Sequence, residues 1–270
     1  MNVQHNTQTM VPSRTANSFR TAIRWCHHHL RDLSDFVFPR QCVLCGSVDE
    51  NEPALTVCYC RDCVIRLCPV PVNRCQRCAA EIGPHATSRN GCIHCRDRKF
   101  KFQNVVCLGM YDSPLRQALL SAKWSFSAVR MQSLAVLLAT ERSDELQTLK
   151  VDRIIPVPQH WRQRFVRHFN PAWILGSVLA REMHILCDVH LLRRARRTRA
   201  QKRVAVSQRF ENQAGAFQVR DSHIVAGEHI LLVDDVLTSG ATCSEAARAL
   251  LQAGARSCSV AVIARVLDSR

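Results

Sequence analysis

Two adjacent carboxylates and a turn rich in hydroxyl groups form the stretch best suited to chemistry in this 270-residue chain. Asp234 and Asp235 follow four aliphatic residues, Ile230 to Val233. Carboxylates here suit neutral hydroxyl donors such as those of a sugar. The residues that follow lead into a helix, so their N–H groups and hydroxyls suit a phosphate; they are Thr238, Ser239, Gly240, Ala241 and Thr242. The pattern predicts a site for a phosphorylated ribose.

Cysteine spacing predicts a second kind of chemistry, which is metal binding. Ten of the 15 cysteines lie between Cys42 and Cys95, and eight of them form four Cys-x-x-Cys pairs. Two such pairs supply the four thiolates of a tetrahedral Zn²⁺ ion, so four pairs predict two structural zinc sites. Cys58 and Cys68 remain alternative ligands, and an interleaved order would exchange pairs between the sites. Sequential pairing is favoured, with Cys42, Cys45, Cys60 and Cys63 in one site and Cys75, Cys78, Cys92 and Cys95 in the other.

The elements around the acidic pair follow from the apolar pattern. Four consecutive aliphatic residues predict a strand that is buried on both faces, because a half-exposed strand would alternate. Thr242 and Glu245 have capping-box spacing, which predicts a helix from Cys243 to Ala253 that ends at Gly254. Further strands are expected over Val105–Tyr111, Val151–Pro158 and Cys258–Val262, and further helices after Ser113-Pro114, over Met131–Leu149 and over Pro171–Met183. In the last of these helices, Trp173 is expected to be buried.

Basic residues gather at two other places. Pro156 is expected to end the pairing of its strand, and Pro158 to stiffen the loop that follows. A pyrophosphate is expected to bind at this loop, since arginine suits paired phosphate oxygens; the residues are Pro158, Arg162 and Arg167. Seven cations from Arg193 to Arg203 predict a mobile loop between Leu192 and Gln208, which either closes over a polyanionic substrate or follows a nucleic-acid backbone.

Composition sets the remaining limits. The net charge of +15 and the sequence pI of about 9.6 favour anionic partners. No apolar run reaches the ~20 residues that a membrane span needs, and the first residues lack the order of a signal peptide, so a cytoplasmic location is expected. The expected organisation is a flexible leader over residues 1–35, a double zinc ribbon over 36–100 and an α/β domain over 101–270.

The chain also resembles known families. The stretch from Ile230 to Thr242 resembles the phosphoribosyl-pyrophosphate (PRPP) binding signature of type I phosphoribosyltransferases. From about Phe36 onward the chain resembles the competence protein F (ComF) family, which has paired Cys-x-x-Cys ribbons. The matching motifs occur in the family's order, at Tyr111–Arg116, Pro156–Pro158, Phe169-Asn170, Gly215–Phe217 and the acidic pair.

This resemblance implies a type I phosphoribosyltransferase fold, which is a mostly parallel five-stranded sheet flanked by helices, with a flexible hood over PRPP and Mg²⁺. It implies that Asp234 and Asp235 are the catalytic pair and that Val236 joins the PRPP-binding residues. It also implies a role in DNA uptake during natural competence. The chain departs from the family pattern at Arg167–Pro171 and Thr198–Gln201. Both segments are expected to contribute to substrate binding, so these departures are compatible with an altered or lost transferase activity.

Two hypotheses of different classes follow. In the first, the protein is a phosphoribosyltransferase that binds PRPP and Mg²⁺, with an acceptor that the sequence does not indicate. In the second, it is a non-catalytic adaptor that retains this fold, binds single-stranded DNA and works with DNA-uptake proteins. The low aromatic content of 6% disfavours a broad base-stacking surface in the second hypothesis.

Overall fold

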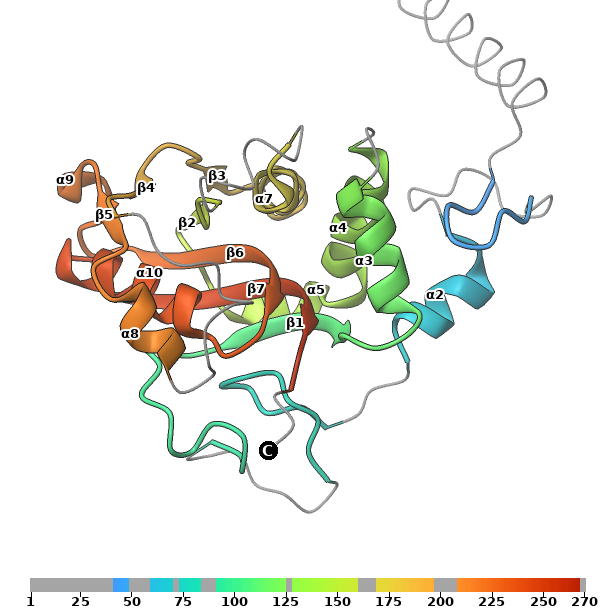
Figure 1. The fold of residues 1–270 in the computed structure, drawn as a ribbon. Coiled ribbons are helices and arrows are strands. Elements are labelled where there is room, and N and C mark those ends of the chain that lie inside the picture. Colours follow the sequence, from blue (N-terminus) through green and yellow to red (C-terminus); the bar gives the residue numbers. More distant parts are fainter. Residues whose placement is uncertain are drawn as a thin grey trace, which may run out of the picture.

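A parallel β-sheet lies at the centre of the protein (Figure 1). The structure is a computed structural model that describes residues 41–48, 59–69, 73–83, 91–124, 128–159, 169–196 and 208–267. Within these residues the sheet has five strands in the order β1-β7-β6-β2-β3, and every adjacent pair is parallel. The strands are β1 (Val105–Met110), β2 (Arg153–Pro156), β3 (Leu186–Cys187), β6 (His229–Leu237) and β7 (Ser257–Arg265). The predicted α/β fold is confirmed.

Helices cover both faces of this sheet. Ile230 and Leu232 of β6 point to one hydrophobic cluster, which includes α10, whereas Leu231 and Val233 point to the other, which includes α3, α4 and α7. This explains why the strand is aliphatic at four consecutive positions. A separate antiparallel pair consists of β4 (Leu192–Arg194) and β5 (Phe217–Val219). The helices are α2 (Arg61–Leu67), α3 (Leu115–Trp124), α4 (Val129–Glu141), α5 (Ser143–Thr148), α7 (Pro171–Met183), α8 (Arg209–Gln213), α9 (Ser222–Val225) and α10 (Ala241–Gln252).

Two helix predictions need correction. The helix predicted over Met131–Leu149 is two helices, because Arg142 leaves the helical conformation with φ −125°. Its guanidinium group instead donates hydrogen bonds to the carbonyl oxygens of Cys107 (3.1 Å) and Leu108 (2.9 Å) on β1. Helix α7 has the predicted bounds, but the prediction that Trp173 is buried is wrong, since this residue is 37% exposed.

The pairing of the strand with two prolines ends at Pro156, as predicted, and one further hydrogen bond to β6 follows. Pro156 pairs with Val233, and the N–H of Val157 donates to the carbonyl oxygen of Val233 at 2.9 Å. In a strand with neighbours on both sides, successive N–H groups point to opposite neighbours. Proline has no backbone N–H, and the N–H that Pro156 lacks would have pointed toward β3. Strands β2 and β3 no longer pair at this level, because their last pair is Ile154 with Cys187. Pro156 therefore removes no hydrogen bond between β2 and β6.

The start of α10 differs from the predicted capping box. The helix begins directly after Gly240, which has a left-handed φ of 80°. The carboxylate of Glu245 does not cap the helix but accepts a hydrogen bond from the N–H of Gly215 (2.6 Å) and pairs with Arg248 (2.6 Å). The capping-box prediction is wrong, and Glu245 instead ties α10 to the segment that enters β5.

The two cysteine segments pack on different faces of the sheet (Figure 1). Residues 41–48 and α2 belong to the cluster of α3 and α4, whereas residues 73–83 and 91–100 belong to the cluster of α10. The domain boundaries at 36–100 and 101–270 stay predictions, and the predicted leader over 1–35 lies outside the described residues. No helix in the described part of the chain is long and apolar enough to cross a membrane.

Candidate functional site

The acidic pair lies inside the central strand rather than after it. Asp234 is level with Val262 of β7, and its carboxylate accepts a hydrogen bond from the backbone N–H of Asp235 at 2.8 Å. Burial, and then the negative charge of Asp235, raise the pKa of Asp234 to about 7. A carboxyl group perturbed in this way is typical of a binding or catalytic site.

Lys123 is a member of this site that the sequence did not indicate. Its ammonium group, near the C-terminal end of α3, lies 2.6 Å from the carboxylate of Asp235. Both side chains are largely buried, with 11% of Lys123 and 19% of Asp235 exposed. In the sequence, the amphipathic pattern of this helix gives Lys123 no link to the acidic pair. The two meet because α3 packs in the hydrophobic cluster on one face of the sheet.

The predicted phosphate turn forms the connection between β6 and α10. Gly240 has a left-handed φ of 80°, and a Cβ at this position would lie 2.7 Å from the ring of Phe100. Both observations require glycine here. Ser239 is 1% exposed and its hydroxyl accepts from the N–H of Ala241 at 3.4 Å, whereas Thr238 and Thr242 are partly exposed. The first N–H groups of α10 thus open beside the carboxyl end of β6, where an anion is favoured.

The segment predicted as a mobile basic loop begins with ordered structure. Arg194 belongs to β4, and its guanidinium group donates to the carbonyl oxygen of Pro158 (3.0 Å) and stacks on Phe217. Burial lowers the pKa of Arg194 to about 10, while the carboxylate of Asp234 acts in the opposite direction. The prediction of a mobile loop is therefore wrong for Leu192 to Arg194, and Arg194 holds the proline loop near the acidic pair.

Several predicted residues lie outside the described part of the chain. They include both arginines of the predicted pyrophosphate loop and four cations of the basic run: Arg162, Arg167, Arg197, Arg199, Lys202 and Arg203. The described part of the predicted ligand site therefore consists of the acidic pair, the turn before α10 and Pro158. Val236 continues β6 between the acidic pair and the turn.

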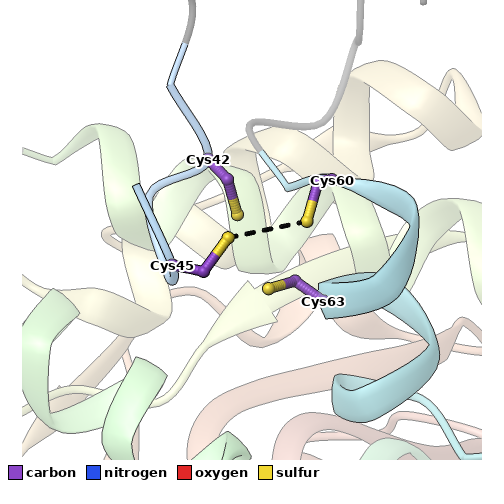
Figure 2. Close-up of side chains that lie close together, drawn as sticks. All are labelled: Cys42, Cys45, Cys60 and Cys63. Carbon is purple, nitrogen blue, oxygen red and sulfur yellow. Dashed lines mark hydrogen bonds between the residues drawn. The ribbon is translucent and has the colours of Figure 1, made fainter. Parts of the chain in front are cut away.

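The eight predicted metal ligands form two groups, and the sequential order is confirmed. In each group the four sulfur atoms lie within 4.8 Å of one another. Figure 2 shows the side chains of the first group pointing toward one another, with 3.7 Å between the sulfur atoms of Cys45 and Cys60. The first tetrad is defined as Cys42, Cys45, Cys60 and Cys63, and the second tetrad as Cys75, Cys78, Cys92 and Cys95.

The geometry of the second tetrad fits a metal ion. Its sulfur–sulfur distances are 3.7 Å for Cys75 and Cys95, 3.6 Å for Cys78 and Cys92, and 3.9 Å for Cys92 and Cys95. A tetrahedral ion with metal–sulfur bonds of about 2.3 Å places its ligands about 3.8 Å apart. A disulfide would require about 2 Å. Burial raises the pKa of Cys95 to about 11 and raises the pKa of Cys78 further. Thiolates at these positions would therefore need a bound cation to stabilise them.

Comparisons with known proteins agree with this architecture. Residues 172–270 match the family model described as "Phosphoribosyl transferase domain". The chain is 31% identical to "DNA utilization protein YhgH" of Shigella flexneri over 187 residues, which is 68% of this chain and 82% of that protein. It is 31% identical to the Salmonella typhimurium protein of the same name, over 73% of this chain and 86% of that one. It is 27% identical to "Competence protein F" of Haemophilus influenzae, over 71% and 84%.

The parallel sheet, the matched domain and the paired cysteine tetrads define a phosphoribosyltransferase-type protein. The chain belongs to the ComF family. Its resemblance to that family, argued from the order of the motifs, is confirmed.

Proposed function

We propose that this protein binds PRPP together with Mg²⁺ and transfers its phosphoribosyl group to an acceptor. The observation that carries the proposal is the position of Asp234 and Asp235, in the C-terminal half of the central strand and shortly before a glycine turn that opens a helix. Ligands of open parallel sheets bind at the carboxyl ends of the strands. The matched phosphoribosyltransferase domain includes both features.

Each part of the proposed site has a distinct role. Asp234 and Asp235 accept hydrogen bonds from the ribose hydroxyls, and Lys123 keeps the carboxylate of Asp235 in position. The turn over residues 238–242 binds the 5′-phosphate through backbone N–H groups and the hydroxyls of Thr238 and Thr242. Mg²⁺ would be bound by oxygen atoms of the pyrophosphate and ribose and would neutralise the leaving group. The acceptor displaces pyrophosphate at the anomeric carbon.

Binding of PRPP tests this proposal directly. Isothermal titration of the purified protein with PRPP and Mg²⁺ is expected to give a saturable signal. The double variant Asp234→Asn with Asp235→Asn should lose it, because neutral amides are weaker acceptors for hydroxyl groups than carboxylates. An Asp97→Asn variant is the matched control, since that carboxylate is on the surface. Equal affinity of the double variant and the wild type would remove the assigned ribose site.

The second candidate is a single-stranded-DNA-binding adaptor that acts in DNA uptake in the cytoplasm, together with DNA-uptake proteins. Two observations favour it, namely the names of the relatives, which refer to DNA utilization and competence, and the net charge of +15. Arg193 in β4 and Arg196 shortly after this strand are exposed, where the basic run begins. Both functions can reside in one chain, because the acidic pair and the exposed cations are different groups. Titration with single-stranded DNA at several salt concentrations separates them.

A further inference from the structure

The second tetrad is joined to the phosphate turn by a buried arginine. Arg265 ends β7 and is 2% exposed. Its guanidinium group donates to the carbonyl oxygen of Cys78 in the second tetrad at 2.8 Å and to that of Leu237 at 3.0 Å. It also donates to the carbonyl oxygen of Thr238, the first residue of the turn. One side chain therefore fixes a metal ligand and the start of the turn relative to each other.

Two further contacts join the segment after the tetrad to the same turn. Arg98 donates from its guanidinium group to the carbonyl oxygen of Ser239 at 2.9 Å. The backbone N–H of Lys101 donates to the hydroxyl of Ser244 in the first turn of α10 at 3.1 Å. The segment after the second tetrad thus contacts residues on both sides of Gly240.

Phe100 fills the space between these contacts. Its ring occupies the position next to Gly240 where a side chain would otherwise lie, and it stacks on Phe102 with 4.6 Å between ring centroids. The guanidinium group of Arg77, which lies between two ligands of the second tetrad, is 5.9 Å from the centroid of Phe100 and donates to the carbonyl oxygen of Arg98 at 2.8 Å. The phosphate turn therefore rests on a surface that belongs to the ribbon.

This surface depends on the tetrad for its own shape. The second tetrad brings together residues 75–78 and 92–95, and a segment so short is ordered mainly by the ion that its ligands share. The first tetrad packs in the other hydrophobic cluster, with α3 and α4. The two tetrads thus have different surroundings although their ligands are the same.

We propose that metal bound at the second tetrad holds residues 238–242 in the conformation that binds phosphate, with Arg98 and Arg265 as the positioning residues. Metal occupancy of this tetrad then sets the affinity of the turn for a phosphoribosyl ligand. The ligand part of this inference rests on the proposed function, whereas the order of the turn can be measured without any ligand.

The test uses the full chain with its metal bound. Hydrogen exchange of the amides in residues 239–244 is measured for the wild type, Arg98→Ala, Arg98→Lys and the control Arg96→Ala, whose arginine is exposed and pairs only with Asp97 among the contacts described. Arg98→Ala should increase exchange in the turn and raise the dissociation constant of PRPP with Mg²⁺ about tenfold, which is the order expected for one hydrogen bond from a charged donor. Arg98→Lys should recover part of both effects, and Arg96→Ala should change neither.

A second variant addresses the metal itself. Cys95→Ser should reduce the metal content by one equivalent and increase exchange in the same amides, while β1 and α4 keep their protection. If Arg98→Ala and Cys95→Ser both leave exchange in the turn at the wild-type level, the inference is overturned. If the wild type shows no PRPP binding, the proposed function fails, and the exchange measurement still decides whether the tetrad orders the turn.

Discussion

Replacing Asp234 by asparagine should stabilise the fold while it removes ligand binding. The carboxyl of Asp234 is partly buried in the central strand, and desolvation followed by the charge of Asp235 raises its pKa from 3.8 to about 7. A group whose pKa is higher in the folded state contributes stability that is fully present below the unfolded pKa and is lost as the pH rises through the folded pKa. Above pH 7, Asp234 is therefore ionised in the folded protein although its surroundings disfavour the charged form.

The size of the effect follows from the same shift. A difference of about 3 pKa units corresponds to at most about 4 kcal/mol of unfolding free energy once the group is ionised in both states, near pH 8. At pH 5 the group is still protonated in the folded state but mostly ionised in the unfolded state. This difference lowers the free energy of unfolding by about 2 kcal/mol. An asparagine resembles the neutral acid in shape. Asp234→Asn should therefore stabilise the protein more at pH 8 than at pH 5.

Urea unfolding at the two pH values, with metal content held constant, measures this difference. Asp97→Asn is the matched control, because its carboxylate is 80% exposed and its ion pair with Arg96 is long, at 3.6 Å, so its loss should change stability little at either pH. Equal stability of Asp234→Asn and the wild type at pH 8, or an equal gain at both pH values, would refute the reasoning. If Asp234→Asn gains stability and loses PRPP binding, Asp234 is a residue that serves function at the expense of stability.

Three further predictions concern the tetrads, the turn and the basic run. Elemental analysis of reduced protein purified without chelators should find about two Zn²⁺ per chain, since two tetrads supply four thiolates each, and a metal-free folded protein would contradict this. Gly240→Ala should destabilise the fold by about 2 kcal/mol in urea unfolding, because alanine is strained at a φ of 80° and its Cβ would collide with Phe100. Adding Phe100→Leu to this variant should restore part of the lost stability, and no recovery would exclude the collision as a cause. Replacing three cations of the basic run by glutamine should reduce the slope of log affinity for single-stranded DNA against log salt by about two units, and an unchanged slope would place the DNA site elsewhere; the three are Arg196, Arg197 and Arg199.

The local part of the fold could be predicted from the sequence, because local patterns determine it. Four aliphatic residues before the acidic pair predicted a doubly buried strand, and β6 is that strand. Regular Cys-x-x-Cys spacing predicted two tetrads, and the sequential order follows from chain proximity. The capping box failed because the spacing of Thr242 and Glu245 cannot show that Gly215 offers a competing donor from a distant segment.

The parts of the site that depend on packing between distant segments could not be predicted. Lys123 reaches Asp235 only because α3 packs on one face of the sheet, and Arg194 supports the proline loop only because β4 pairs with β5. Arg265 did leave a signal, since it is the one charged residue in the buried strand Ser257–Arg265. A charge in such a strand implies a buried partner, but the sequence does not say that the partner is the ribbon.

A crystal structure of the metal-bound protein with PRPP and Mg²⁺ tests the central claim most directly. We expect the 5′-phosphate to lie against the backbone N–H groups of residues 239–242 and the ribose hydroxyls to lie within hydrogen-bonding distance of Asp234 and Asp235. A ligand bound at another place, or with its phosphate turned away from Gly240, would contradict the assignment of the site.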